Sequence, residues 1–146
     1  MESKDITKFI EIQYLSDEHR LFYKEMLKQC RNNDIYHRSL FYLLGLSAET
    51  RAHINELFDF YDDCINPDGL TAGWQTGGTT RICRFAFNLW NDFCGDTSGD
   101  GQALDVSAYT PSNLFCCEFA RYFCEAIKIR FPEYCGQIKN FEIFEK

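Results

Sequence analysis

The sequence lacks the long apolar run and the leader that mark a membrane-spanning or secreted chain. No stretch reaches about 18 uncharged apolar residues, the shortest length that suits a membrane-spanning helix. The opening residues, from Met1 to Asp5, show no basic region followed by the apolar run that a signal peptide requires. We therefore expect no contact with a membrane and a cytoplasmic location in a bacterial host.

Paired metal ligands are also missing from the sequence. The eight cysteines include no pair at the C-x2–4-C spacing of structural zinc sites, and the three histidines form no HxH or HxxxH pair. The even number of cysteines would permit four disulfides, but without a secretion signal we expect reduced thiols. No local signature places a cysteine beside a histidine. The prediction is a chain with no catalytic residue, no metal and no cofactor, and not an enzyme.

The chain has no excess of basic residues, since 15 Lys and Arg face 22 Asp and Glu, for a net charge of −7. This balance argues against direct binding of nucleic acid or of anionic membranes. The acidity is concentrated between Ala52 and Ala120, where ten acids and two arginines give −8, against +1 for the rest of the chain. The ten acids are Glu56, Asp59, Asp62, Asp63, Asp68, Asp92, Asp96, Asp100, Asp105 and Glu118.

What the sequence does contain is the material for a hydrophobic core. The 146 residues are 45% hydrophobic and 16% aromatic, which excludes a disordered chain. Neither a repeat nor a low-complexity linker divides them. We therefore expect residues 1–146 to form one domain, since domains of roughly 100–200 residues are usual.

Hydrophobic spacing predicts a mainly α, compact domain of about five helices. Ser16 and Ser47 are predicted N-caps, and Thr79 or Thr80 is expected to cap a helix after the break at Gly77 and Gly78. The predicted helices span residues 16–31, 35–46, 47–61, 79–93 and 112–130. The third rests on Ile54, Leu57, Phe58 and Tyr61, which follow the i, i+3, i+4, i+7 spacing of an amphipathic helix.

The two ends of the chain are predicted to form a small two-stranded element. Residues 7–14 alternate weakly with period two, and residues 137–146 could pair with them. A long acidic loop is expected at residues 95–111, and its length makes it either functional or mobile. It begins like a calcium loop, with oxygen donors at Asp96, Ser98 and Asp100, but Ser107 stands where the bidentate Glu belongs.

The acidic segment supplies the first candidate site. A clustered negative surface attracts basic partners and can occupy a groove built for phosphates. The carboxylates expected to make this contact are those of Asp59, Asp62, Asp63, Asp96 and Asp100. The alternative is that the segment only keeps the protein soluble.

A second candidate is an anion site at the predicted break before residue 79. Backbone N–H groups at a helix N-terminus, with threonine hydroxyls and an arginine, can hold a phosphate. The alternative is a helix cap with a tight turn. The residues of this candidate are Trp74, Gln75, Gly77, Gly78, Thr79, Thr80 and Arg81.

Several blocks of the sequence together resemble an uncharacterised domain-of-unknown-function family of small proteins from clostridia, related Firmicutes and their mobile elements. The blocks are Ser16–His19, Trp74–Gly77 with Arg84, Ala86-Phe87, Leu89–Asn91, Phe115–Cys117 and Glu125–Tyr134. The resemblance implies no activity. It adds a context, because small acidic proteins of mobile elements often bind and block host defence machinery.

The leading hypothesis is a non-enzymatic inhibitor that binds a basic protein surface on a nucleic-acid-handling defence complex, such as a CRISPR effector. One alternative is a module or enzyme that binds an anion or nucleotide at residues 74–81. Another is a structural or oligomerisation protein, because 16% aromatic residues can exceed the need of one core. The oligomeric state stays open.

Overall fold

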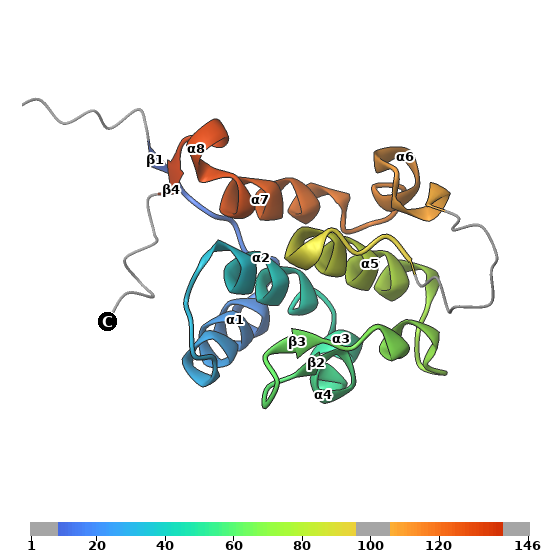
Figure 1. Ribbon diagram of the computed structural model, residues 1–146. Coiled ribbons are helices and arrows are strands. Elements are labelled where there is room, and N and C mark those ends of the chain that lie inside the picture. The colour runs from blue at the N-terminus through green and yellow to red at the C-terminus, as the bar shows by residue number, and fades with distance from the viewer. Residues whose placement is uncertain (1–8, 96–105, 139–146) are drawn as a thin grey trace, which may run out of the picture.

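The structure is a computed structural model that describes residues 9–95 and 106–138 (Figure 1). Its α-helices are α1 (Asp17–Gln29), α2 (Ile35–Leu44), α3 (Ala48–Ala52), α4 (Ile54–Leu57), α5 (Gly77–Asn91), α6 (Pro111–Leu114), α7 (Ala120–Arg130) and α8 (Pro132–Cys135). The strands and 3-10 helices are β1 (Phe9–Ile10), β2 (Phe58–Asp59), β3 (Cys64–Ile65), β4 (Gln137–Ile138), η2 (Pro67–Thr71) and η3 (Ser107–Tyr109). The prediction of a mainly α fold with a small β element is confirmed.

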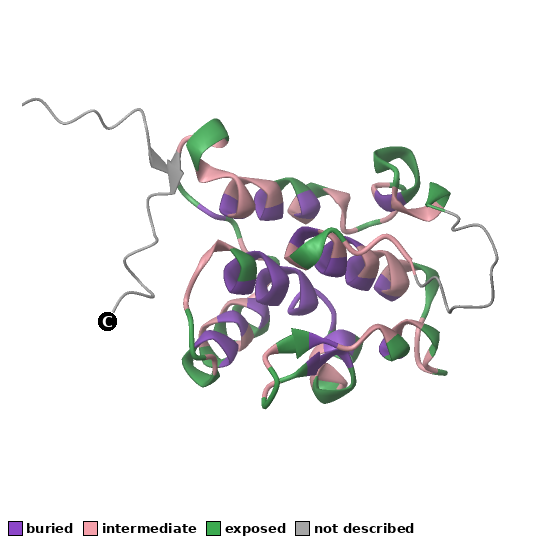
Figure 2. Cartoon of the chain, in the orientation of Figure 1, coloured by how far each residue is buried: buried purple, intermediate pink, exposed green. Residues whose placement is uncertain are grey.

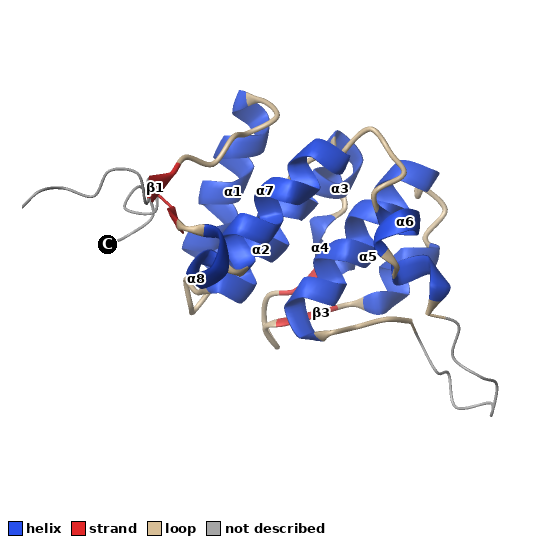
Figure 3. Cartoon of the chain, turned by 90° about the horizontal axis from the view of Figure 1, so that it is seen from above, coloured by secondary structure: helices blue, strands red, loops and turns tan. Residues whose placement is uncertain are grey.

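Helix α2 lies at the centre of the fold and packs against α1, α5 and α7. Every residue from His37 to Leu44 is buried, and Figure 2 shows buried residues along most of this helix. A helix that is apolar on all sides is expected in the middle of a core. Figure 3 shows from above how α1, α5 and α7 lie around α2.

Two of the predicted helix starts are confirmed by their capping bonds. The hydroxyl of Ser16 accepts the His19 backbone N–H at 3.1 Å, and that of Ser47 accepts the Thr50 N–H at 3.0 Å. These bonds satisfy donors that an α-helix leaves free in its first turn. The buried Thr50 hydroxyl also donates to the Leu44 carbonyl at 2.6 Å, which joins the end of α2 to the start of α3.

Helix α5 begins earlier than predicted, and its cap is Thr76 rather than Thr79 or Thr80. The Thr76 hydroxyl accepts the Thr79 N–H at 3.2 Å, and the Thr79 hydroxyl accepts the Thr76 N–H at 2.7 Å. This reciprocal pair is a capping box. Gly77 and Gly78 are therefore the first two residues of the helix, and the expected break there is wrong.

The predicted helix 47–61 is divided at His53 into α3 and α4, and it is wrong beyond Leu57. The backbone of Phe58 is extended, and β2 pairs antiparallel with β3, with Phe58 opposite Ile65. The helical spacing would place Tyr61 on the buried face, but the chain leaves the helix, and Tyr61 lies 84% exposed at the tip of the hairpin. The β2–β3 hairpin, residues 58–65, was not expected from the sequence.

The predicted helix 112–130 is divided into α6 and α7. In a continuous helix Phe115 and Phe123 would be about 12 Å apart, at 1.5 Å per residue. The break instead brings their rings edge to face at 5.4 Å, and both rings pack against Phe85. Burial of three aromatic rings in one cluster therefore outweighs the continuity of the helix.

The two ends of the described chain pair as predicted, over a shorter length. Strand β1 runs parallel to β4, with Phe9 opposite Gln137 and Ile10 opposite Ile138. Nearby, the backbone N–H of Gln13 donates to the Glu125 carboxylate at 3.0 Å. Most of the predicted acidic loop, residues 96–105, lies outside the described residues. Within the described ranges, no helix has the length and apolar character that crossing a membrane requires.

Gly69 is predicted to be essential for the packing of η2 on α4. A Cβ at Gly69 would lie 2.6 Å from the Glu56 carbonyl oxygen, whereas one at Gly73 would meet nothing within 4 Å. We expect Gly69→Ala to lower the free energy of unfolding by about 1–3 kcal/mol, because the backbone must shift. The matched Gly73→Ala variant should change it by less than about 1 kcal/mol. Urea denaturation of both variants makes the comparison, and equal stabilities would contradict the predicted clash.

Candidate functional site

The structure brings three of the five predicted acidic contact residues together. Asp59, Asp62 and Asp63 all lie on the β2–β3 hairpin, with Asp59 and Asp62 exposed. Asp96 and Asp100 lie outside the described residues. The hairpin therefore carries all of the predicted contact residues that the structure describes.

Asp59 organises the tip of the hairpin. Its Oδ1 accepts the backbone N–H of Tyr61 at 2.9 Å and that of Asp62 at 3.0 Å. An aspartate that accepts from its own backbone two and three residues later fixes a tight turn. The guanidinium of Arg31 donates to the Tyr61 carbonyl and joins the end of α1 to the tip.

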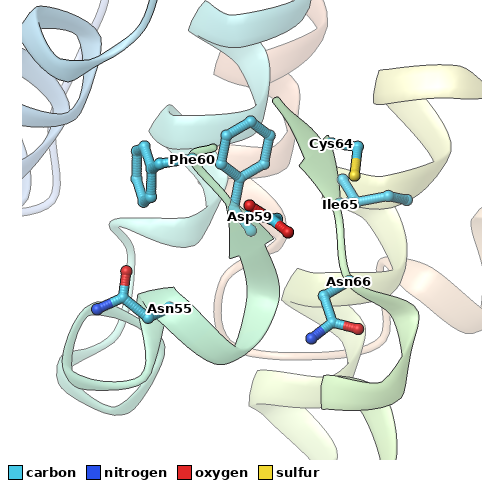
Figure 4. Close-up of a pocket in the computed structure, with 7 residues that line it drawn as sticks. Asn55, Asp59, Phe60, Cys64, Ile65 and Asn66 are labelled. Atoms are coloured by element: carbon cyan, nitrogen blue, oxygen red, sulfur yellow. The ribbon is translucent and has the colours of Figure 1, made fainter. Parts of the chain in front are cut away.

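An open pocket of about 460 Å³ lies beside Asp59 (Figure 4). Its lining combines one carboxylate, two amides, two aromatic rings, a thiol and an aliphatic side chain. The lining residues are Asn55, Phe58, Asp59, Phe60, Cys64, Ile65 and Asn66. Figure 4 shows the Asp59 carboxylate between the two strands, with Asn55 and Asn66 on either side of the hollow. This combination of groups suits a cationic side chain with an apolar stem.

Asp63 differs from the other two hairpin acids because it faces inward. Its φ of 59° is in the left-handed region, which aspartate tolerates better than most residues. Its Oδ1 lies 2.9 Å from Nε2 of His37. The other ring nitrogen of His37, Nδ1, lies 2.8 Å from Oδ1 of Asp34, the N-cap of α2. His37 is thus held between two carboxylates, with 4% of its side chain exposed.

The thiol of Cys30 completes this group. Its sulfur, a His37 ring nitrogen and an Asp63 carboxylate oxygen all lie within 4.8 Å of one another. Burial, together with the negative charges of Asp63 and Asp34, raises the pKa of Cys30 to about 12. The thiol is therefore protonated at neutral pH, and His37 has no free nitrogen to accept its proton. This arrangement does not activate a cysteine nucleophile.

Asp34 is a stable carboxylate in this group. Burial alone would raise its pKa, but hydrogen bonds from the backbone and ring of His37, and from the Tyr36 N–H, lower the pKa below its usual value. Hydrogen bonds to the charged form favour ionisation. Asp34 therefore stays negative over the whole physiological range.

The predicted anion residues are close together, but most of their polar groups bond within the protein. Trp74 stacks on His53 at 4.4 Å and donates its indole N–H to Glu56 at 2.9 Å. The Gln75 amide donates to the Gly69 carbonyl at 3.0 Å and accepts the Thr79 hydroxyl at 2.7 Å.

The remaining groups of this candidate have similar structural partners. Arg81 donates to the carbonyls of Asn113 at 2.8 Å and Gly77 at 3.2 Å. The Thr80 hydroxyl lies 3.4 Å from the Gln75 amide oxygen, at the limit of a hydrogen bond. A Cβ at Gly78 would lie 3.4 Å from a Glu118 carboxylate oxygen, so a negative group already lies beside the start of α5.

Comparison with known protein families gives a match over most of the chain. The model of a family described as a family of unknown function, DUF6075, matches residues 10–142. The chain belongs to the DUF6075 family. The match confirms the resemblance to an uncharacterised domain family. No curated protein and no solved structure matches this DUF6075 chain.

Sequence reasoning missed the group around His37 in this DUF6075 member. The spacing of Asp34 and His37 is readable, since an N-cap aspartate and the residue three positions later lie side by side. No pattern links His37 to Asp63, because residues 58–61, the first half of the hairpin that carries Asp63, were expected to be helix. Cys30 lies just after α1, and no short motif connects it to either residue.

Proposed function

We propose that this DUF6075 protein is a non-enzymatic binding module that contacts a basic protein surface through the β2–β3 hairpin. In this proposal, the pocket beside Asp59 receives a lysine or arginine side chain of the partner. The observation that carries it is the combination of a carboxylate, two amides and two aromatic rings around one open hollow. A charged hydrogen bond to a carboxylate is among the stronger contacts at protein interfaces.

The charges around the pocket support this choice of partner. Asp62 lies exposed at the tip, and Glu56 and Asp68 lie exposed on the neighbouring α4 and η2. Such a negative surface accelerates the approach of a basic partner and disfavours acidic ones. Arg31 is a basic residue at the tip, where it holds the Tyr61 carbonyl. Asp63, which is paired with His37, is assigned no contact with the partner.

The proposed partner class follows from the charge and the mobile-element resemblance. A surface of carboxylates can bind the lysine and arginine residues that normally hold phosphates. We therefore propose a nucleic-acid-handling protein, with a CRISPR effector or another defence complex as the leading class. The anion hypothesis for residues 74–81 is not favoured, because Arg81 and Gln75 are engaged within the protein.

The test removes the negative charge of the hairpin and keeps its shape. Asp59→Asn with Asp62→Asn retains an acceptor oxygen at Asp59, so the turn should persist. We expect this double variant to bind the partner at least about tenfold more weakly, since interfacial charge pairs often contribute more than 1.4 kcal/mol. The partner is captured from extract of the source cells, identified by mass spectrometry and then titrated in purified form.

A matched control changes net charge by the same amount elsewhere. Asp17 in α1 and Glu133 in α8 are exposed, and α8 lies away from the hairpin (Figure 1). The Asp17→Asn/Glu133→Gln variant should capture the same partner with unchanged affinity. High salt should weaken the complex, and added nucleic acid should compete for the partner. Equal affinity of the hairpin variant and the wild type would show that the hairpin is not the contact.

A further inference from the structure

Three side chains with different ligand atoms meet at one point beneath the hairpin. Cys30 ends α1, His37 lies in the first turn of α2, and Asp63 lies between β2 and β3. Their sulfur, nitrogen and oxygen atoms lie within 4.8 Å of one another. Among the residues that the structure describes, this is the one group of three such ligands, and we call it the Cys–His–Asp cluster.

We infer that the Cys–His–Asp cluster is a binding site for a divalent transition-metal ion, with Zn²⁺ the best match. Thiolate, imidazole and carboxylate are the three ligand types that zinc takes in proteins, at about 2.0–2.3 Å. A tetrahedral ion at that range separates its ligand atoms by roughly 3.5 Å. The sulfur can approach this separation by side-chain rotation, because Cys30 is only partly buried.

Asp34 has the position of a residue that orients a metal-binding histidine. Its Oδ1 lies 2.8 Å from Nδ1 of His37, so the opposite nitrogen, Nε2, points toward Asp63. Carboxylates bound to the second nitrogen fix the ring and the tautomer in most histidine metal sites. Asp34 is itself fixed, because the same oxygen caps α2 through the Tyr36 and His37 N–H groups at 3.1 and 3.0 Å.

The aromatic side chains around His37 restrict its movement further. The centre of the Trp90 ring lies 4.8 Å from that of the His37 imidazole, edge to face. The centre of the Phe58 ring lies 6.4 Å from the same imidazole. A ring held by two carboxylates and two aromatic contacts retains its rotamer without an ion. Such a preorganised ligand lowers the entropy lost when a metal binds.

A divalent ion binds a thiolate, a neutral imidazole and a carboxylate, so its binding to the cluster displaces the protons of these ligands to solvent.

Three protein ligands leave one position of a tetrahedral ion for water. Asp63 is closer to solvent than His37, with 20% of its side chain exposed against 4%. The site therefore has an accessible side at the hairpin. The inference does not depend on the proposed partner, since Asp63 makes no contact in that proposal.

Metal titration tests the inference directly. Purified reduced protein, freed of metal by a chelator, should bind Zn²⁺ with a stoichiometry of one at the tight site. Co²⁺ in its place should give the near-ultraviolet absorption of a cobalt–thiolate bond and the visible bands of tetrahedral coordination. Failure of the wild-type protein to bind Zn²⁺, or Co²⁺ binding without the thiolate band, would overturn the inference.

Two conservative variants separate this site from the other thiols. Cys30→Ser should abolish the cobalt–thiolate band and weaken Zn²⁺ binding at least about tenfold. Asp34→Asn preserves the N-cap, because asparagine caps as well as aspartate, but should weaken binding about tenfold by releasing the histidine ring. Circular dichroism of both variants establishes that they fold.

The matched control is Cys64→Ser. Cys64 is exposed, directly follows Asp63 and lines the pocket rather than the cluster. Its replacement should leave both the band and the zinc affinity unchanged. If Cys64→Ser weakens binding as much as Cys30→Ser does, or if neither has an effect, the ion is held by surface thiols and the inference is wrong.

Discussion

Phe58→Ala is expected to lower the free energy of unfolding by about 3–5 kcal/mol, as removal of a fully buried phenylalanine usually does. The side chain is 1% exposed. Its ring meets those of Phe41 at 5.1 Å, Phe60 at 5.0 Å and Trp90 at 5.5 Å. Loss of the ring leaves a cavity between α2, α5 and the hairpin that these rigid neighbours cannot fill.

The effect of Phe58→Ala on the free energy of unfolding is measured by urea denaturation at neutral pH, with Phe58→Leu as the control. Leucine keeps most of the apolar volume and should lower the stability by less than half as much. The loss should also loosen the hairpin, which rapid amide exchange of β2 and β3 would report. A change below about 1 kcal/mol for the alanine variant would mean that the ring does not anchor the hairpin.

Acidification from pH 7 to pH 4 is expected to remove about 3 kcal/mol of stability through His19 alone. Burial lowers the pKa of His19 from 6.5 to about 4, against the opposing effect of the Tyr42 carbonyl. The Nδ1 atom of His19 accepts the Leu15 N–H at 3.0 Å. The neutral ring therefore carries its proton on Nε2 and donates it to the Tyr42 carbonyl at 2.7 Å. Protonation would break the Leu15 bond and leave a charge in the core.

The direction of this effect follows from the lowered pKa. The unfolded chain binds a proton near pH 6.5 and the folded chain only near pH 4. The contribution of His19 to the free energy of unfolding is therefore complete above pH 6.5 and is lost progressively as the pH falls to 4. Asp34, whose pKa is also lowered, contributes in a more acidic range, below the usual value for aspartate.

Denaturation curves at half-unit steps between pH 7.5 and 4 measure this dependence. His19→Gln removes the titrating group and keeps a donor for the Tyr42 carbonyl. We expect the variant to be less stable at pH 7 and to lose less stability between pH 6.5 and 4 than the wild type. Parallel curves for the two proteins would show that His19 does not titrate in this range.

Local signals in the sequence predicted much of the helical structure. Ser16 and Ser47 cap their helices as expected, because N-capping depends on residues only three positions apart. The predicted helix 35–46 is confirmed as α2, which is the centre of the core. Thr76 was missed because the glycines after it were interpreted as a break, although two glycines fit within the first turn of α5.

Features that depend on distant contacts could not be predicted in the same way. Phe58 has helical spacing relative to Ile54 and Leu57, but packing against Phe41 and Trp90 draws it into an extended strand. The hairpin then places Asp63 beside His37, 26 positions earlier in the chain. The candidate contact residues on the hairpin were identified by charge, whereas the pocket beside Asp59 depends on this unexpected turn.

The pairing of β1 with β4 has a consequence for the order in which the chain folds. The nearby bond between Gln13 and Glu125 closes a loop of 112 positions, and parallel pairing of the ends closes a longer one. Contacts this remote form late, because nearly the whole chain must be ordered before they lower the free energy. During synthesis β4 emerges after all the other described elements, so β1 must wait for them before it can pair.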